Sequence, residues 1–287
     1  MENNSSLFAD NPAATFGNVT GNIIYKRTGN TSLAYNYWSS PVTGATISSI
    51  SAPGFVPNTY QYETSNATGI DYDGTQAGWL AVGPANVMAP GRGYIATGAG
   101  TASFTGNPNQ GGVTYTASAG GDGNTWNLIG NPYPAQVNAF TFLSQNTGKI
   151  TGGSIYIWDD DITGGTGWTA GDYIVSNGTV TVNGPNSGAP FSGSIGSCQG
   201  FFINWNSGGS STINWNTSAR LLAGTNAEFF DVQDYARLKL KLSNAQEMNS
   251  ETALIFPADA TDAADLTYDA LRCQVTQVLE STHSLIQ

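Results

Sequence analysis

The chain has 287 residues, of which 10% are charged, and its formal net charge is −11. This acidic balance argues against a nucleic-acid-binding protein, because binding phosphate requires clustered Lys and Arg. No run of about 18 apolar residues is present, so we expect no membrane insertion, and 39% hydrophobic residues argue against a disordered chain.

Short β-type runs follow one another along the chain, separated by Gly, Pro and Asn about every ten residues. In chain order they are GNIIYKR, TYQYET, GWLAVG, GYIAT, VTYTAS, SIYIWD, DYIVS, TVTVNG and GFFINW. The clearest strand is RLKLKLS, where Leu238, Leu240 and Leu242 share one face, and ETALIF supplies a returning partner. The nearest approach to a helical pattern lies at 262–271. Regular short strands with turn signals predict a sandwich or a barrel.

Landmarks of the first half recur in the second half in the same order, which indicates a tandem duplication. The stretch YNYWSSPVTG resembles TWNLIGNPYPA, so that Trp38 is matched with Trp126 and Pro41 with Pro132. The further matches are TYQYET with SIYIWD, Gly78-Trp79 with Gly167-Trp168, GRGYIAT with CQGFFIN, and SFTGNP with INWNTS.

We therefore predict an all-β fold with two tandem related antiparallel β-sandwich or jelly-roll-like units, each of roughly 90 to 110 residues. The first unit with its N-terminal extension takes residues 1–118, and the second takes 119–224, stretched by an insertion around 176–196. Residues 225–287 form a short additional β element, which we interpret as an incomplete domain.

A motif that recurs in both units predicts a structural corner rather than a binding site, because Pro stops a strand from continuing. Trp38 and Trp126 should then lie at equivalent strand ends. For the same reason we expect Trp79, Trp126 and Trp168 to be mostly buried.

A series of motifs runs through nearly all of the chain. In order, they are YNYWSSPV, GRGY, FTGNPNQGGVT, WNLIGNPYP, CQGFF, NTSAR, RLKLKLSN, ETALIF and ATDAADLTYDA. Together they resemble the large surface and secreted proteins of Bacteroidota that the type IX secretion system exports. The resemblance implies an extracellular or outer cell-surface location and a β architecture, and it implies no particular ligand. Such proteins usually carry a C-terminal sorting domain, which is not visible before the chain ends at STHSLIQ.

The first residues, MENNSSLFAD, lack the charged start and the apolar stretch of a signal peptide. The 36 glycines and the low charge are nevertheless typical of an extracellular β protein. We therefore expect a mature or partial chain rather than an intracellular protein.

Catalysis is not expected from the ionisable residues. The single histidine, His283, lies close to the C-terminus, so a catalytic triad or a histidine-based zinc site would depend on a frayed tail. Cys198 and Cys273 lack metal-type spacing, and the sequence leaves open whether they form a disulfide. A glycosidase needs two carboxylates, and the candidates, none in a recognisable motif, are Glu63, Asp71, Asp73, Asp159, Asp160, Asp161 and Asp172.

Three groups of acidic residues are candidate calcium sites, because calcium prefers carboxylate oxygens. The groups are Asp71 and Asp73 in IDYDG; Asp159, Asp160 and Asp161 in WDDDITGG; and Asp259, Asp262, Asp265 and Asp269 in ADATDAADLTYDA. The third is favoured, since it brings four carboxylates from one short segment. The alternative is that all are solvated residues of turns and caps, where Asp is common anyway.

Aromatic residues without a partner in the other unit are the candidates for exposed stacking on a glycan. These ligand-binding candidates are Tyr37, Tyr133 and Trp205.

Two classes of function are therefore favoured over an enzyme. The first is a non-catalytic extracellular module of the cell surface that mediates adhesion or binds a glycan or another surface ligand. The second is a structural subunit that self-associates into a surface layer or an extracellular fibre. A secreted glycoside hydrolase or its accessory domain is a third alternative. Repeated units multiply weak sites, which favours the adhesive module.

Calcium at one of the acidic groups would offset carboxylate repulsion in a chain of net charge −11. Calcium should then raise the midpoint of thermal unfolding, because a ligand that binds the folded state alone stabilises that state by mass action. Unfolding curves recorded in calcium and in chelator measure this effect. Identical curves would remove the calcium hypothesis.

Overall fold

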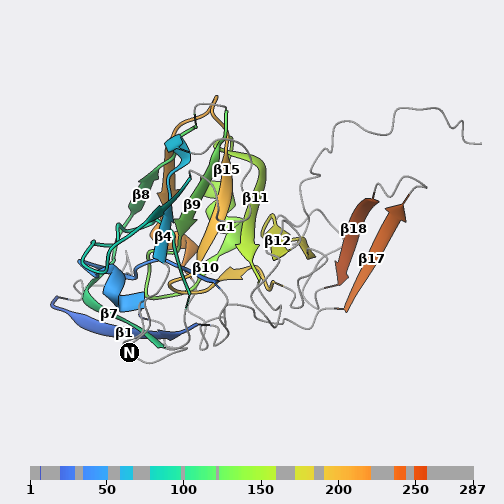
Figure 1. Cartoon of the computed structure of the whole chain (residues 1–287). Helices are drawn as coiled ribbons and strands as arrows, with labels where there is room; N and C mark the ends of the chain where they lie inside the picture. Colours follow the sequence, from blue (N-terminus) through green and yellow to red (C-terminus); the bar gives the residue numbers. More distant parts are fainter. Residues whose placement is uncertain are drawn as a thin grey trace, which may run out of the picture.

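The structure is a computed structural model that describes residues 7, 20–29, 35–50, 59–66, 78–97, 101–120, 123–159, 172–183, 191–220, 236–243 and 249–256, the last two ranges by backbone alone. The regular structure of these residues is almost all β-strand, with one short α-helix, which confirms the predicted all-β class (Figure 1). No helix among them is long and apolar enough to cross a membrane.

All nine strands predicted from the short runs are present, and the two-unit region has seven further strands outside these runs. The predicted strands are β1 (Ile23–Thr28), β4 (Thr59–Tyr62), β5 (Trp79–Ala81), β6 (Tyr94–Thr97), β8 (Val113–Thr116), β11 (Ile150–Trp158), β12 (Tyr173–Ser176), β13 (Thr181–Asn183) and β15 (Gly200–Trp205). The others are β2 (Tyr35–Trp38), β3 (Val42–Thr43), β7 (Thr101–Pro108), β9 (Trp126–Gly130), β10 (Val137–Asn138), β14 (Ser194–Ile195) and β16 (Thr212–Trp215).

Two antiparallel sheets form the centre of the molecule. The first has the strand order β2-β6-β4-β5, and the second has the order β13-β12-β11-β15-β9. When the strands are matched in chain order, β2 with β9, β4 with β11, β5 with β12 and β6 with β15, the two sheets have the same order, and β13 is an extra strand. A tandem duplication would produce this arrangement. The duplication and its boundaries stay predictions, and β8, just before the predicted boundary, pairs with β16.

The matching of Trp38 with Trp126 is wrong. Trp38 is the last residue of β2, whereas Trp126 is the first residue of β9. Trp38 pairs with Tyr94 and Ile129 pairs with Phe201, so Trp38 and Ile129 occupy corresponding places. The two tryptophans were matched because they are the same residue type. The positions that correspond in the strand pairing are instead those at the same distance from the following proline, whichever of them carries the indole.

The matching of Trp79 with Trp168 is also not supported by the strand pairing. Trp79 lies opposite Tyr62, and in the second sheet Tyr173 lies opposite Trp158. Tyr173 therefore corresponds to Trp79, while Trp168 lies outside the described residues.

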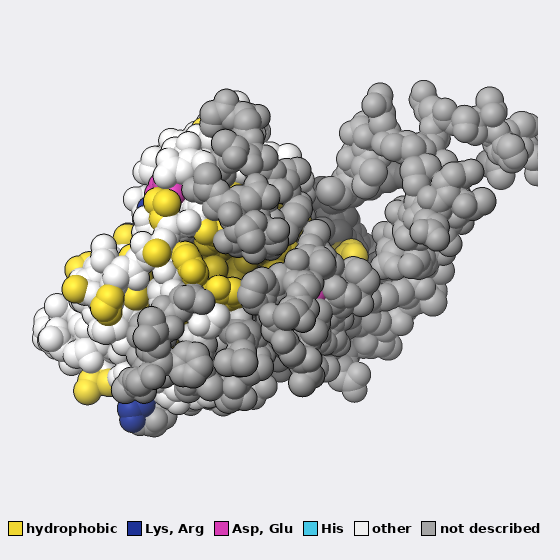
Figure 2. Space-filling model, viewed as in Figure 1, with side chains coloured by type: hydrophobic (Ala, Val, Ile, Leu, Met, Phe, Trp, Pro, Cys, Tyr) yellow, Lys and Arg dark blue, Asp and Glu magenta, His cyan; other side chains and the backbone are white. Residues whose placement is uncertain are grey.

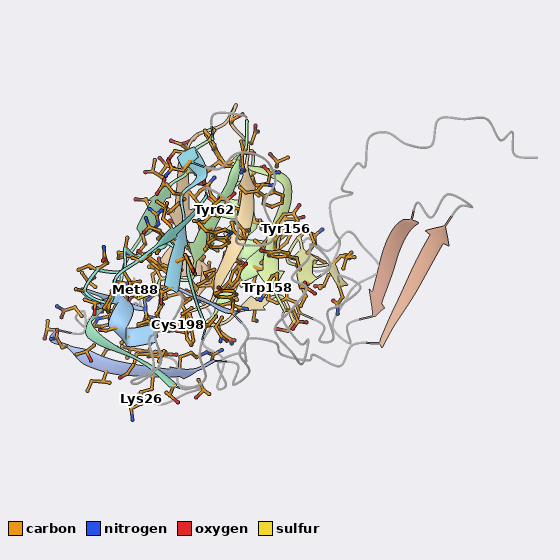
Figure 3. All side chains as sticks on the ribbon, viewed as in Figure 1. Lys26, Tyr62, Met88, Tyr156, Trp158 and Cys198 are labelled. Carbon is orange, nitrogen blue, oxygen red and sulfur yellow. The ribbon has the colours of Figure 1, made fainter. Side chains whose placement is uncertain are left out.

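The central sheets face each other across a shared aromatic layer, which we call the middle layer. Its buried members are Tyr37, Tyr62 and Ile95 from the first sheet and Leu128, Trp158, Tyr173 and Phe202 from the second. Figure 3 shows Tyr62, Tyr156 and Trp158 in the middle of the molecule, whereas Lys26 points outward from β1. Side chains alternate along a strand, so the residues between these fill the opposite face of each sheet.

The opposite face of each central sheet is covered by a further layer. Trp38, Tyr94 and Ala96 of the first sheet pack with Tyr25 of β1 and Phe104 of β7. On the equivalent face of the second sheet, a set of buried side chains packs against the helix and β16. These residues are Ile129, Ile155, Ile157, Ile174, Phe201 and Ile203. Burial on both faces explains why strands such as YNYW and WNLIG carry bulky side chains at consecutive positions.

The only α-helix of the described residues, α1 (Ala139–Gln145), was not predicted. Asn138 caps it, because the Asn138 side chain accepts a hydrogen bond from the Thr141 N–H at 2.8 Å. The helix buries Phe142, whose ring stacks on Trp215 with centroids 4.3 Å apart. The predicted helical pattern at 262–271 lies outside the described residues.

The C-terminal hairpin was predicted correctly. Strand β17 (Ala236–Ser243) pairs antiparallel with β18 (Asn249–Phe256), and Leu238 lies opposite Leu254. The hairpin forms a two-stranded sheet separate from the two central sheets.

The ends of the two central sheets are joined by reciprocal backbone contacts, which we call the seam. Trp38 forms a β-bridge with Gln199, and the corresponding Ile129 forms one with Arg92. The Ser39 N–H donates to the Cys198 carbonyl at 2.8 Å, and the Gly130 N–H donates to the Gly91 carbonyl at 3.1 Å. Because corresponding positions make corresponding bonds, the seam has approximate two-fold character.

The seam requires a small residue at Gly130. A Cβ atom there would lie 2.5 Å from Ser39 Cβ and 3.0 Å from the Gln199 carbonyl oxygen. Contacts this short force the backbones apart, since a packed interior has no space to absorb an added methyl group.

We therefore expect Gly130→Ala to lower the free energy of unfolding by about 1–3 kcal/mol, the usual cost of overpacking. Gly208→Ala is the matched control, because its added Cβ would be no closer than 3.5 Å to any atom. Denaturant unfolding measures both variants. Equal free energies of unfolding for the two variants would show that the seam tolerates separation of its backbones.

Candidate functional site

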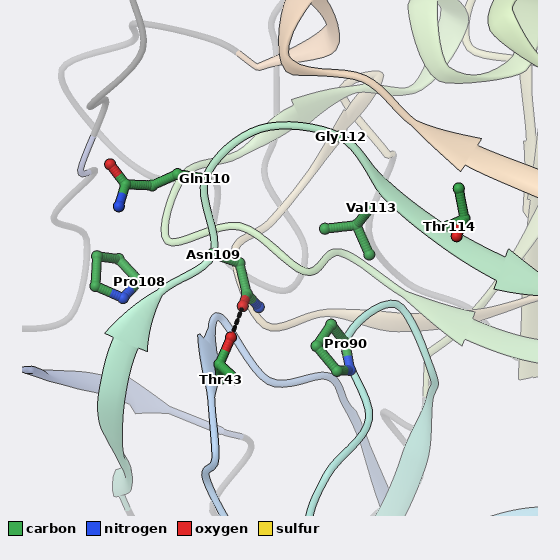
Figure 4. Close-up of a pocket in the computed structure, with 8 residues that line it drawn as sticks. All are labelled: Thr43, Pro90, Pro108, Asn109, Gln110, Gly112, Val113 and Thr114. Atoms are coloured by element: carbon green, nitrogen blue, oxygen red, sulfur yellow. Dashed lines mark hydrogen bonds between the residues drawn. The ribbon is translucent and has the colours of Figure 1, made fainter. Parts of the chain in front are cut away.

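A surface cleft of about 500 Å³ lies where the chain passes from β7 to β8 (Figure 4). Its lining consists of Thr43, Pro90, Pro108, Asn109, Gln110, Gly112, Val113 and Thr114. None of these eight side chains is ionisable. The cleft offers hydroxyl and amide groups beside the small apolar surfaces of Pro90 and Val113.

Asn109 fixes the base of the cleft. Its Nδ2 group donates to the carbonyl oxygens of Ser40 at 3.1 Å and Pro132 at 2.8 Å, and its Oδ1 atom accepts from Thr43 Oγ1 at 2.8 Å. Asn109 is buried, whereas Thr43 and Thr114 are exposed. A ligand in the cleft would therefore meet hydroxyl groups on a base that is already hydrogen-bonded.

The neighbouring corner TWNLIGNPYPA is built from internal hydrogen bonds. The buried Asn131 donates from Nδ2 to the carbonyls of Ala135 at 2.8 Å and Gly196 at 2.9 Å, and its Oδ1 accepts from the Tyr133 N–H at 3.0 Å. The polar groups of Asn131 are thus used inside the fold, as expected for a structural corner.

Arg92 forms an ion pair beside the seam. Its guanidinium donates to Glu63 Oε2 at 2.7 Å and to the Tyr62 carbonyl at 3.1 Å. The two side chains are 22% and 29% exposed, so water screens the pair and its contribution to stability is small.

Two phenols near this ion pair are neutral at physiological pH. Burial raises the pKa of Tyr115 to about 12, against a smaller lowering by Arg92. Burial also raises the pKa of Tyr94, although the Ala89 N–H that donates to its hydroxyl acts in the opposite direction. Neither phenol can supply a phenolate nucleophile or base at neutral pH.

Cys198 is a free and fully buried thiol within the hydrophobic layer that contains Trp38 and Tyr94. Burial raises its pKa to about 12, while the side-chain hydrogen bond with Ser197 acts to lower it. The thiolate needed for nucleophilic chemistry is therefore scarce at neutral pH. Cys273, its proposed disulfide partner, lies outside the described residues.

Two of the three predicted glycan-stacking residues are not exposed, so this prediction is wrong for them. Tyr37 stacks on Trp158 with centroids 5.6 Å apart and planes 5° apart, and its hydroxyl lies 2.8 Å from that of Tyr173. Tyr133 is fully buried, and its hydroxyl lies 2.7 Å from the Trp215 carbonyl. Tyr37 is buried because the facing sheet covers its side of the first sheet, whereas Tyr133 lies in the corner after β9 and is buried in the cluster that contains Phe142 and Trp215.

The third candidate, Trp205, is half-buried. Its indole N–H donates to the Ser210 carbonyl at 3.2 Å, and its ring packs against the layer beneath the second sheet. A half-buried ring offers less surface than a flat stacking platform requires.

Two of the three tryptophans expected to be mostly buried are only partly so, and the third, Trp168, lies outside the described residues. Trp79 and Trp126 are half-buried and pack against the middle layer. Trp126 meets Tyr156 edge-on with centroids 4.6 Å apart, and Trp79 meets Tyr62 at 5.0 Å. Both are therefore packing residues at the margin of the layer.

Most of the candidate calcium ligands lie outside the described residues. Asp159 is buried, and its N–H donates to the Asp172 carbonyl at 2.9 Å. The others lie outside the described residues: Asp71, Asp73, Asp160, Asp161, Asp259, Asp262, Asp265 and Asp269. In the described part of the chain, no three His, Cys, Asp or Glu residues are grouped so that they could hold a metal ion.

Comparison with known proteins gives a family and no function. A family model described as "Domain of unknown function (DUF8693)" matches residues 1–286. Neither a curated protein nor a solved structure matches the chain.

The burial of Tyr37 leads to a test that separates packing from ligand binding. We expect Tyr37→Ala to lower the free energy of unfolding by about 3–5 kcal/mol, as for other large aromatic truncations in a core. Val87→Ala is the control, because Val87 is 62% exposed and its truncation should be neutral. A Tyr37→Ala protein of unchanged stability that no longer bound a polysaccharide would return this residue to a binding surface.

Proposed function

We propose that this chain, which belongs to the DUF8693 family, is a non-catalytic structural module of the extracellular cell surface. The observation that carries the proposal is the middle layer, in which aromatic side chains from both central sheets pack against one another. A module of this kind holds its two sheets in one fixed orientation and presents a polar exterior.

Rigidity is supported by the way in which the two sheets are joined. Aromatic contacts cross between them at several points, including Tyr37 with Trp158 and Tyr62 with Phe202 at 5.0 Å. The seam adds backbone hydrogen bonds at the sheet ends. Relative motion of the sheets would break both sets of contacts together, so we expect one cooperative unit.

A non-catalytic role is supported by the chemistry of the described surface. The cleft is lined by neutral side chains, and Tyr115 and Cys198 hold their protons at neutral pH. Among the described residues that Figure 2 shows, white and yellow atoms predominate, and few side chains are magenta or blue. Acid–base catalysis usually needs ionisable groups whose pKa lies near the working pH.

An extracellular location is supported by composition and by the resemblance to exported Bacteroidota proteins. A chain that is rich in Gly, has few charged residues and carries a net charge of −11 suits a protein exposed to the medium. Protease applied to intact source cells tests the location. A chain that stays protected in intact cells would contradict the proposal.

Glycan binding in the cleft is a second candidate function. The exposed hydroxyl groups of Thr43 and Thr114 and the amide of Gln110 can exchange hydrogen bonds with a neutral, hydroxyl-rich ligand. Pro90 and Val113 supply the small apolar contacts that sugar C–H groups prefer. An adhesive module would use this site with modest affinity, since the cleft is open and polar.

A panel of insoluble polysaccharides distinguishes these functions. The structural proposal predicts no release of reducing ends and no retention of the purified chain. Retention that Thr114→Arg abolishes would instead support glycan binding, because an arginine there fills the cleft. Thr116→Arg is the matched control, since Thr116 lies on the same strand, is exposed and does not line the cleft. Release of reducing ends that a carboxylate substitution abolishes would overturn the non-catalytic proposal.

A further inference from the structure

The two central sheets differ at one edge. In the second sheet, β12 has β11 on one side and β13 on the other. In the first sheet, the corresponding strand β5 pairs with β4 and is the last strand of the sheet. Among the described strands, the first sheet thus lacks a counterpart of β13.

The register shows which groups the missing strand would meet. Tyr60 of β4 lies opposite Ala81, and the corresponding Tyr156 of β11 lies opposite Val175. Val175 is in turn paired with Val182 of β13. Ala81 therefore occupies the place at which the second sheet accepts its extra strand.

The backbone groups of Ala81 point to the open side. The Val82 N–H donates to the Thr59 carbonyl at 2.9 Å, and the Glu63 N–H donates to the Gly78 carbonyl at 2.7 Å. These bonds show that Gly78, Leu80 and Val82 direct their backbone groups toward β4. Because the direction alternates along an antiparallel strand, Trp79 and Ala81 direct theirs outward.

Exposure agrees with an unfilled position. Leu80 is 36% exposed, whereas Ile174, which lies at the corresponding place on β12, is 0% exposed. Ala81 is exposed as well. The residues of β5, Trp79, Leu80 and Ala81, include no charged residue or proline, the usual guards of a free sheet edge.

We propose that β5 pairs with β5 of a second copy of this chain. A two-fold axis near Ala81 makes the two strands antiparallel, which is the relation that β12 and β13 already have within one chain. The pairing joins the two four-stranded sheets into one continuous sheet and brings the Leu80 side chains of both copies to the junction. This pairing adds a partner, a second copy of the chain, to the structural role proposed above. The inference rests on that role only for the biological purpose of the pairing.

The size of the edge limits the strength of the pairing. Strand β5 has three residues, so the new interface is small and the dimer should form only at high local concentration. Molecules held side by side on a surface satisfy that condition through their effective concentration.

Sedimentation analysis of the full chain tests the inference. We expect a reversible dimer to appear between about 10 μM and 1 mM, a range typical of weak interfaces. Ala81→Pro should weaken association at least about ten-fold, because it removes the outward N–H and leaves the bonds to β4 intact. Leu80→Lys is the second variant, since it places two like charges at diagonal positions on the same face of the junction, within reach of each other through their long side chains.

Thr181→Pro is the matched control on the other free edge, β13, and it should leave dimerisation unchanged. A chain that stays monomeric over the whole range would overturn the inference, as would a dimer that neither β5 variant weakens. Loss of the dimer in Thr181→Pro instead would assign the contact to β13. Unfolding midpoints identify any variant that fails to fold, and Leu80→Lys then decides the outcome. Protease accessibility on intact cells is measured separately, so a failed pairing leaves the proposed surface role standing.

Discussion

Packing between the two central sheets is the interaction on which the rest of this structure depends. Tyr37 on the first sheet and Trp158 on the second lie nearly parallel, and the hydroxyls of Tyr37 and Tyr173 meet at 2.8 Å. Large aromatic rings bury much apolar surface in a small number of residues. Once these rings are enclosed, each sheet still needs a cover on its other face, and the outer strands and α1 provide it.

The same packing decides what chemistry the surface can offer. Two of the aromatic side chains considered for a glycan platform, Tyr37 and Tyr133, are enclosed, and burial holds the protons on Tyr115 and Cys198. The surface that remains is neutral around the cleft and apolar along the edge of β5. These are the properties on which the proposed structural role rests.

Close approach of the backbones at the seam restricts sequence more than the aromatic layer does. Gly130 touches Ser39, and Gly93 lies against Leu128, where an added Cβ would be 2.6 Å from Leu128 Cγ. The corresponding Gly200 lies 3.1 Å from the Trp38 backbone by the same measure. Gly93 and Gly200 belong to the GRGY and CQGF motifs, so the resemblance between these motifs reflects a geometric requirement of the seam.

The sequence by itself determined the all-β class, nine strands of the central region and the hairpin of β17 and β18, because alternation and turn residues act over a few neighbouring positions. It failed for Trp38 and Trp126, since residue type does not fix strand register. Only the tertiary structure decided that Tyr37 and Tyr133 are buried, that the cleft has a neutral lining and that β5 is the last of the described strands in its sheet. Each of these features depends on segments far apart in the chain. A local sequence pattern does not show which distant strand or sheet will cover a given residue.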